Sequence, residues 1–380
     1  MSWEYKTLDQ LGEVSRGRSK HRPRNDPSLF GGKYPFIQTA DVKAANFYIT
    51  EYDTTYNEKG LAQSRLWNPG TLCITIAANI ADTGILAMDA CFPDSVMGFL
   101  PYEGIADVRF VKYCFDILQQ NCKKISQGAA QDNLSWEKLS TILFPVPPIA
   151  VQTKIADVLS TYDNLIENNK KQIKLLEEAA QRLYKEWFID LHFPGHETTP
   201  IVDGVPEGWE KVEVGTCIAK IARTKQVMTA ELLEVGKIPV VDQSRNFIAG
   251  YTNDEETVVD LGIPIIVFGD HTRVLKYIQF PFAKGADGTQ LIVTNNEKMP
   301  QSLFYCSLVN VDLSNYHYAR HFKYLKAEEI LLPSLDVAHQ FDGVVSPLFE
   351  QVQKLRDKCK LAAEARDRLL PKLMSGEIEV

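Results

Sequence analysis

The residues with the clearest chemistry form a short basic run near the start of the chain. Five fixed positive charges and one histidine follow each other there with no acidic residue among them: Arg16, Arg18, Lys20, Arg22 and Arg24. Arginine can bond guanine through two nitrogens or clamp a phosphate, and a glycine in the loop lets the backbone approach a nucleic acid. The run is a candidate nucleic-acid contact. The alternative is a solvated basic loop with no partner.

A second polar stretch lies between residues 123 and 131, before the first predicted long helix. Its candidate contacts are Lys123, Lys124, Gln127 and Gln131. A plain turn explains the same residues equally well.

Loop tips in the second half of the chain carry similar residue types. Two follow strand-like runs, at 270–273 and 286–290, and a basic and aromatic stretch spans 316–324. Glutamine can read adenine, and aspartate can accept a hydrogen bond from cytosine or position an arginine. The candidates are His271, Arg273, Asp287, Gln290, Arg320, His321 and Lys323. The third stretch could also be an ordinary packed hairpin.

The motifs that would indicate an enzyme are missing. There is no GxxxxGK[ST] phosphate loop, no GxGxxG after a strand, no HExxH and no GxSxG. Asp270 and His271 are too few ligands for a metal site. We therefore expect no catalytic residue and no metal site in this chain, and a role in binding or scaffolding.

Composition is that of an ordinary globular protein, with 45% hydrophobic and 24% charged residues. The net charge of −8 argues against a nucleic-acid partner only if charge is spread evenly, and the basic run shows that it is not. Seven cysteines without a CxxC pair indicate reduced thiols. No apolar run is long enough to span a membrane and the first residues lack a signal-peptide core, so we expect a cytoplasmic protein with no membrane partner.

Two long helices are the strongest structural signal. Residues 149–193 contain no glycine or proline, and apolar residues recur there in steps of four and three. The same stepping recurs near the end of the chain, and both patterns are typical of a coiled coil. The predicted seam positions are Ile155, Leu159, Ile166, Ile173, Leu176 and Leu183 in the first helix and Val345, Leu348, Val352, Leu355 and Leu369 in the second. Asn169 and Arg366 are polar interruptions.

The start and the partner of the second helix are open at this point. Gly343 and Pro347 could kink the helix, or Ser346 and Pro347 could be its first residues. A duplicated chain favours intramolecular antiparallel pairing of the two helices. The alternative is that each helix pairs with another copy of the protein.

The chain also looks duplicated. Each half opens on a tryptophan, Trp3 or Trp209, and closes on an apolar run into proline before its long helix. Pro and Gly residues at 194–208 mark a linker. The predicted plan is a first globular domain at 1–148, a helical spacer at 149–193, a second globular domain at 194–334 including the linker, and a C-terminal helical spacer at 335–380.

Several strings in this layout resemble the specificity subunits of type I restriction–modification systems. QGAAQDNLSWEKLSTILFPVPPIAVQTKIADVL at 127–159 is similar to the end of a target-recognition domain running into that family's first central helix. FGDHTRVLKYIQFPFAKGADGTQLI at 268–292 and HYARHFKYLKAEEILLP at 317–333 are similar to a second such domain, and RDRLLPKLMSGEIEV at 366–380 to the family's C-terminal helix. The first recognition domain is matched mainly by VMGFLP at 96–101.

The resemblance implies an α+β fold. Two α/β target-recognition domains stand in tandem, separated by two long helices that form an intramolecular antiparallel coiled coil with pseudo-twofold symmetry. Each domain would read one half of an asymmetric, interrupted site in double-stranded DNA. Two adenine methyltransferase subunits, and restriction/translocase subunits, are the implied partners. The resemblance implies no cofactor on this chain, with S-adenosylmethionine, ATP and Mg held by those partners.

Two other functions fit the same pattern. The chain could be the DNA-reading subunit of a lone methyltransferase or of a different defence complex. It could also be a coiled-coil scaffold whose globular ends bind proteins.

Overall fold

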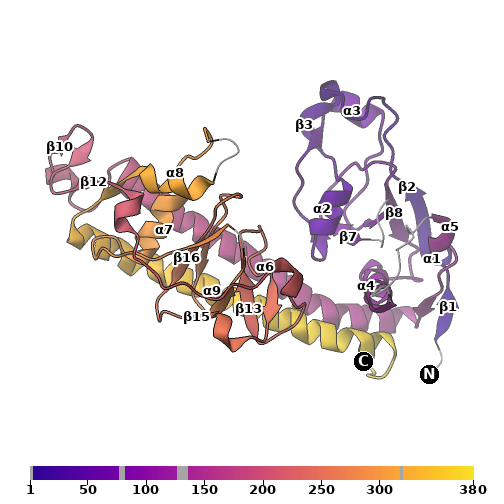
Figure 1. The fold of residues 1–380 in the computed structure, drawn as a ribbon. Coiled ribbons are helices and arrows are strands. Elements are labelled where there is room, and N and C mark those ends of the chain that lie inside the picture. Colours follow the sequence, from indigo (N-terminus) through magenta and orange to yellow (C-terminus); the bar gives the residue numbers. More distant parts are fainter. Residues whose placement is uncertain (1–2, 77–81, 126–135, 287, 317–319) are drawn as a thin grey trace. The chain divides into compact units, whose positions relative to one another are not determined.

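The fold is given by a computed structural model that describes residues 3–76, 82–125, 136–286, 288–316 and 320–380, with the backbone alone for 120–125. Contacts divide the chain into two compact units. Unit 1 comprises Met1–Asn169 and Lys358–Val380, and unit 2 comprises Lys170–Asp357. Each unit therefore contains a globular part and one stretch of each of the two long helices, α6 and α9 (Figure 1).

Unit 1 is built on a five-stranded sheet with the strand order β2-β8-β6-β7-β4. Its neighbours are antiparallel except β4 and β7. The strands of unit 1 are β1 (Glu4–Lys6), β2 (Gly12–Arg16), β3 (Phe30–Pro35), β4 (Tyr48–Ile49), β5 (Thr55–Tyr56), β6 (Leu72–Thr75), β7 (Thr83–Leu86), β8 (Val96–Pro101) and β9 (Phe144–Val146). Its shorter helices are α1 (Leu8–Leu11), α2 (Thr39–Ala44), α3 (Glu58–Ala62), α4 (Val108–Ile125) and α5 (Trp136–Leu139).

The sheet of unit 1 is covered rather than exposed. All four residues of β6 and of β7 are buried, as expected for apolar strands with packing on both faces. Phe110 and Phe115 of α4 join Leu72 and Phe99 of the sheet in one hydrophobic core. The same core includes residues of α6 and α9, so the helix pair of unit 1 is anchored directly to its globular part.

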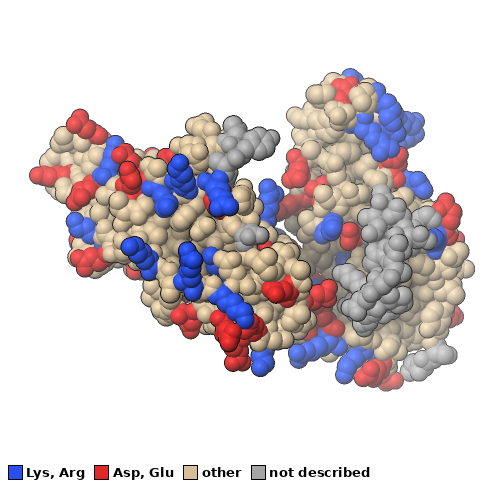
Figure 2. Space-filling view, in the orientation of Figure 1, with Lys and Arg blue, Asp and Glu red and all other residues tan. Residues whose placement is uncertain are grey.

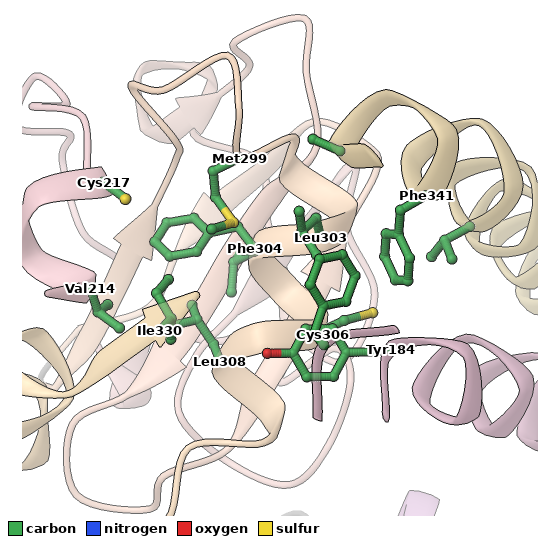
Figure 3. Close-up of a cluster of buried hydrophobic side chains, with 14 of the residues drawn as sticks. Tyr184, Val214, Cys217, Met299, Leu303, Phe304, Cys306, Leu308, Ile330 and Phe341 are labelled. Carbon is green, nitrogen blue, oxygen red and sulfur yellow. The ribbon is translucent and has the colours of Figure 1, made fainter. Parts of the chain in front are cut away.

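Unit 2 contains a four-stranded sheet, β14-β13-β18-β15, and a three-stranded sheet, β17-β16-β19. Its strands are β10 (Ile201–Val202), β11 (Val205–Pro206), β12 (Glu210–Glu213), β13 (Ile238–Val241), β14 (Gly250–Thr252), β15 (Val258–Val259), β16 (Ile265–Gly269), β17 (Leu275–Ile278), β18 (Phe282–Lys284), β19 (Thr289–Ile292) and β20 (Glu329–Leu332). Its shorter helices are α7 (Gln301–Val309) and α8 (His321–Ala327). Leu303 and Phe304 of α7 pack with Tyr184 of α6 and Phe341 of α9 in the core (Figure 3).

One arrangement occurs in both units. A strand near the start of each globular part pairs antiparallel with the strand just before the long helix: β1 pairs with β9, and β12, which follows the β10–β11 hairpin, pairs with β20. In each unit this pairing joins the start of the globular part to its end, and the long helix begins directly after the second strand of the pair. This repetition supports the duplication that the sequence predicts.

The long helices are α6 (Ile149–Tyr184), continued by a π-helical turn at Lys185–Ile189, and α9 (Leu335–Met374). Helix α9 runs through Gly343 and Pro347, so the alternative of a start at Ser346 is wrong. Pro347 costs the helix one backbone hydrogen bond and about 3 kcal/mol. Gly343 and Pro347 are both exposed, so water can satisfy the freed carbonyl, while the neighbouring Val345 and Phe349 are fully buried and hold the helix in place.

Within each unit α6 and α9 run antiparallel. In unit 1 the Cys359 thiol lies 3.7 Å from the Ile166 carbonyl oxygen, and Arg366 pairs with Asp163. In unit 2 the Arg356 guanidinium lies 2.6 Å from the Glu177 carboxylate. The described helices thus pair with each other inside one chain, as the fold prediction requires.

The predicted seam residues lie in or beside the helix interface. Ile155, Leu159, Ile166, Val345, Val352 and Leu355 are buried. Leu183 and Leu348 pack against the core of unit 2 and Leu369 against that of unit 1. Ile173 and Leu176 are half-buried.

The predicted linker contains structure of its own. β10 and β11 form a hairpin whose turn, Asp203-Gly204, has positive φ at both residues, as a two-residue turn of this kind requires. Phe193 packs on Trp209 with ring centroids 4.6 Å apart, which fixes both ends of the segment.

Candidate nucleic-acid interface

The basic loop of unit 1 continues an edge strand. Arg16 is the last residue of β2, which forms one edge of the five-stranded sheet. The loop packs beside α3, because the Ser64 hydroxyl donates to the Arg18 carbonyl at 2.7 Å and the His21 N–H donates to the Gln63 side chain at 2.9 Å. All five predicted cations, Arg16, Arg18, Lys20, Arg22 and Arg24, are exposed.

Two of these cations bond within the protein. The Arg22 guanidinium donates to the carbonyls of Ser19 and His21 at 2.7 and 2.8 Å. Arg24 forms an ion pair with Asp94 at 2.8 Å. Both guanidinium groups therefore stabilise the shape of the loop.

The loop ends in a second carboxylate contact. The Asp26 carboxylate accepts from the Ser28 backbone N–H at 2.9 Å and lies 2.8 Å from the His21 ring. Hydrogen bonds from Ser28, together with the one from His21, lower the pKa of Asp26 to about 2. The carboxylate therefore stays charged at neutral pH and holds the loop end in place.

Further cations, which the sequence analysis did not single out, lie on the same part of unit 1. Lys59 of α3 donates to the Ser28 hydroxyl at 2.7 Å, and Lys33 lies near Glu58 at 3.3 Å. Arg65 stacks on Trp67, with its guanidinium carbon 3.7 Å from the ring centroid. Figure 2 shows Lys and Arg side chains gathered on the part of unit 1 that carries α3 and β3. These positions are scattered along the sequence, so only the fold brings them together.

The second polar stretch of the first half is described only in part. Lys123 and Lys124 belong to α4, near its C-terminal end. Gln127 and Gln131 lie outside the described residues.

In unit 2 two loops converge on Gln243. The His271 N–H donates to the Gln243 side-chain oxygen at 3.1 Å, and the Thr272 hydroxyl donates to its backbone oxygen at 2.6 Å. Gly288 has a positive φ, and a Cβ there would lie 2.8 Å from the amide of Gln243 and from the His271 ring. Only glycine fits this close approach. Sequence reasoning missed Gln243 because it is not adjacent in sequence to either partner loop.

A buried lysine supports the loop that carries Gln243. The Lys276 ammonium donates to the carbonyls of Asp242 (2.8 Å) and Asn246, and the residue is 4% exposed. Burial lowers the pKa of Lys276, with Asp242 opposing that change. The loop is therefore held in place from its buried side.

Arg273 and His321 are engaged inside unit 2. The Arg273 guanidinium donates to the carbonyls of Leu313 at 3.0 Å and Tyr316 at 3.4 Å, and its Nε lies 3.4 Å from His321. His321 is 4% exposed, and burial, reinforced by Arg273, lowers its pKa. A direct DNA contact by His321, as the sequence predicted, does not fit this placement. A contact by Arg273 would require it to leave these carbonyls.

The remaining predicted contacts of unit 2 lie nearby. Exposed His271 is at the tip of the loop after β16, and half-buried Gln290 lies in β19, opposite Phe268 of β16. Arg320 and Lys323 are exposed at the start of α8. Asp287 lies outside the described residues. The Tyr316 and Tyr324 rings of this region stack on each other, with centroids 4.1 Å apart.

A metal site is not evident in the described part of the chain. No group of three or more His, Cys, Asp or Glu residues there could hold a metal ion, and no helix there is long and apolar enough to cross a membrane. A pocket of about 530 Å³ in unit 1 is lined mainly by apolar residues such as Trp3, Val146 and Ile155. Of its charged residues, Glu4 and Lys6 pair with each other at 3.2 Å.

The geometry thus offers two polar, loop-built surfaces, each carried by its own globular part. Comparison with known proteins indicates the family of the chain. The family model of the type I restriction modification DNA specificity domain matches residues 1–178. The specificity subunit of the type I restriction enzyme MjaIX from Methanocaldococcus jannaschii is 26% identical over the full length of this chain and 94% of its own. The chain belongs to the specificity subunits of type I restriction–modification systems.

Other relatives agree with this assignment. The specificity subunit of EcoR124I/EcoR124II from Escherichia coli is 24% identical over 51% of this chain and 50% of its own. The crystal structure of the S subunit from M. genitalium has the same fold, with a TM-score of 0.58 at 15% identity, covering 98% of this chain and 96% of that one.

Membership defines the role of this specificity subunit. It recognises a DNA target, and it belongs to a class of recognition subunits that bind DNA within larger complexes and are generally not catalysts themselves. The loop-built surfaces of the two units are therefore candidate DNA-binding surfaces.

Proposed function

We propose that this specificity subunit reads a bipartite, asymmetric site in double-stranded DNA, one half with each globular part. The observation that carries the proposal is the repeated layout, in which a strand pair closes each globular part just before a long helix. The candidate contact loops differ between the two copies: a cationic run in unit 1, and the Gln243, His271 and Gln290 region in unit 2. Two different loop sets would read two different half-sites.

The helix pair would set the gap between the half-sites. Helix α6 has 36 residues, about 54 Å at 1.5 Å per residue. Along B-DNA this is more than one helical turn of about 34–36 Å. The domain plan proposed here keeps 1–148 and 194–334 as recognition domains and 149–193 and 335–380 as spacers.

The specificity subunit would act with other subunits in the cytoplasm. Two adenine methyltransferase subunits would bind it and carry S-adenosylmethionine, and restriction/translocase subunits would bring ATP and Mg chemistry. The specificity subunit would supply only DNA recognition and the placement of its partners.

Exchange of one recognition domain tests the bipartite reading. Residues 210–333 are replaced by the equivalent segment of a relative, and the methylated motif is determined in cells that contain the methyltransferase partner. We expect one half of the motif to change and the other half to persist. A change in both halves would overturn the modular reading.

A further inference from the structure

Exposure alternates along the start of the basic loop. Arg16, Arg18 and Lys20 are exposed, while the intervening Gly17 and Ser19 are buried. Successive side chains of an extended chain point to opposite sides, so this alternation places the three cations on one side of the segment. They form a row, which we call the cationic row.

The cationic row is held by a fixed backbone. The N–H groups of Gly17 and Arg18 donate to the carbonyls of Val96 and Phe92 at 2.8 and 2.9 Å, so pairing continues past the end of β2. A Cβ on Gly17 would lie 2.3 Å from the Pro93 carbonyl oxygen, which shows how closely the segment packs. A ligand that met the row would not have to order the backbone first, and this lowers the entropic cost of binding.

The side chains of the row differ from those of the other two cations in the loop. Within the described residues, the side chains of Arg16, Arg18 and Lys20 make no hydrogen bond or ion pair. The Arg22 side chain bonds to the carbonyls of Ser19 and His21, and the Arg24 side chain pairs with Asp94. The five cations carry the same formal charge, but the side chains of two of them bond within the protein and those of three do not. The sequence alone could not separate these two groups.

The spacing of the row matches a phosphate backbone. Every second residue of an extended chain repeats at about 6.7 Å. Phosphates of one DNA strand rise about 3.4 Å each along the axis, and winding round the duplex lengthens their separation to roughly 7 Å. A regular row suits a regular series of phosphates better than base edges, which require convergent donors.

We infer that Arg16, Arg18 and Lys20 bind consecutive phosphates of one DNA strand, while Arg22 and Arg24 only shape the loop. The inference rests on the proposed DNA-binding function. It assigns the row to orienting the subunit on DNA and not to choosing the sequence, because phosphate contacts carry no direct sequence information.

Paired charge removals test the inference on the full-length subunit. Arg18→Gln with Lys20→Gln removes two charges from the row, and Arg22→Gln with Arg24→Gln removes two from the same loop as a matched control. Affinity is measured against salt concentration for duplexes with and without the methylated motif. The methylated motif is read in cells for each variant, and Arg18→Lys serves as a charge-preserving variant.

We expect the row variant to flatten the slope of log affinity against log salt by roughly 1.8, about 0.9 per lost phosphate contact, on both duplexes. Its motif should remain unchanged. The control pair and Arg18→Lys should keep the wild-type slope.

The inference would be overturned if the row variant kept the wild-type slope, or if the control pair flattened the slope equally. It would also be overturned if the row variant no longer specified one of the bases of the methylated motif. Failure of the proposed function would look different, since the unmodified subunit would then show no preference for its motif.

Discussion

At the scale of single residues, Asp163 of α6 has no exposed surface and pairs with Arg366 of α9. It also accepts hydrogen bonds from the Tyr113 hydroxyl at 2.6 Å and the Asn46 amide at 3.3 Å. Burial and the charge of Asp163 raise the pKa of Tyr113, which therefore stays protonated and donates. Asp163 thus connects both helices of unit 1 to its globular part.

The corresponding positions of unit 2 are apolar. The two seams repeat at an offset of 186 residues, as Ile155 and Phe341 illustrate, and this offset relates Asp163 to Phe349 and Arg366 to Ala180. Phe349 and Ala180 both lie in the core of unit 2. The same helix pairing is therefore achieved with an ion pair in one unit and apolar packing in the other.

Removing one partner of the buried pair should destabilise unit 1 more than removing both. Arg366→Met leaves a buried, uncompensated carboxylate and should cost about 3–5 kcal/mol, whereas Asp163→Leu with Arg366→Met should recover part of that loss. The recovery is incomplete because the buried Tyr113 hydroxyl then lacks its acceptor. Amide hydrogen exchange in the 155–166 segment measures the effect locally. Equal protection in the single and double variants would show that the charge at Asp163 is not compensated by Arg366.

At the scale of elements, both long helices could be predicted from the sequence because their 4-3 stepping is regular. The start of α9 could not, since local glycine and proline signals were outweighed by burial of Val345 and Phe349. The burial of Asp163 was also missed, because a charged residue outside the apolar 4-3 stepping is expected at the surface. The sequence could not separate Arg22 and Arg24 from the other three cations of the loop. Their partners are loop carbonyls and Asp94, and the folded structure, not the local sequence pattern, brings these partners close.

Helix length should control the gap in the DNA site. Four residues inserted into both helices, after Lys171 and after Asp357, add about 6 Å, close to two base pairs of rise. Four residues leave the seam nearly in phase, as a stutter, so the variant should be active with a longer gap and unchanged half-sites.

Two-residue insertions at the same points rotate the seam by about 200° and should inactivate the subunit by exposing Leu176, Ala180 and Leu183. A two-residue insertion in the exposed Asp203-Gly204 turn is the control and should leave the motif unchanged. The motif is read by methylome sequencing in each case. An active four-residue variant with the original gap would show that the helices do not set the spacing.

At the scale of the whole molecule, the chain carries a net charge of −8, yet the candidate DNA-binding loop of unit 1 is locally basic. The two compact units differ from the predicted division into domains and spacers, because each unit includes parts of both long helices. Each globular part is therefore packed on the helix pair of its own unit.

Methylome sequencing of a host with and without the gene for this chain tests the central claim most directly. We predict that one adenine-methylated motif disappears with the gene, and that this motif consists of two different specified halves separated by a gap of unspecified bases. Restoring the gene should restore the same motif. A methylome that does not change when the gene is removed, or a lost motif that is a single uninterrupted sequence, would contradict the account.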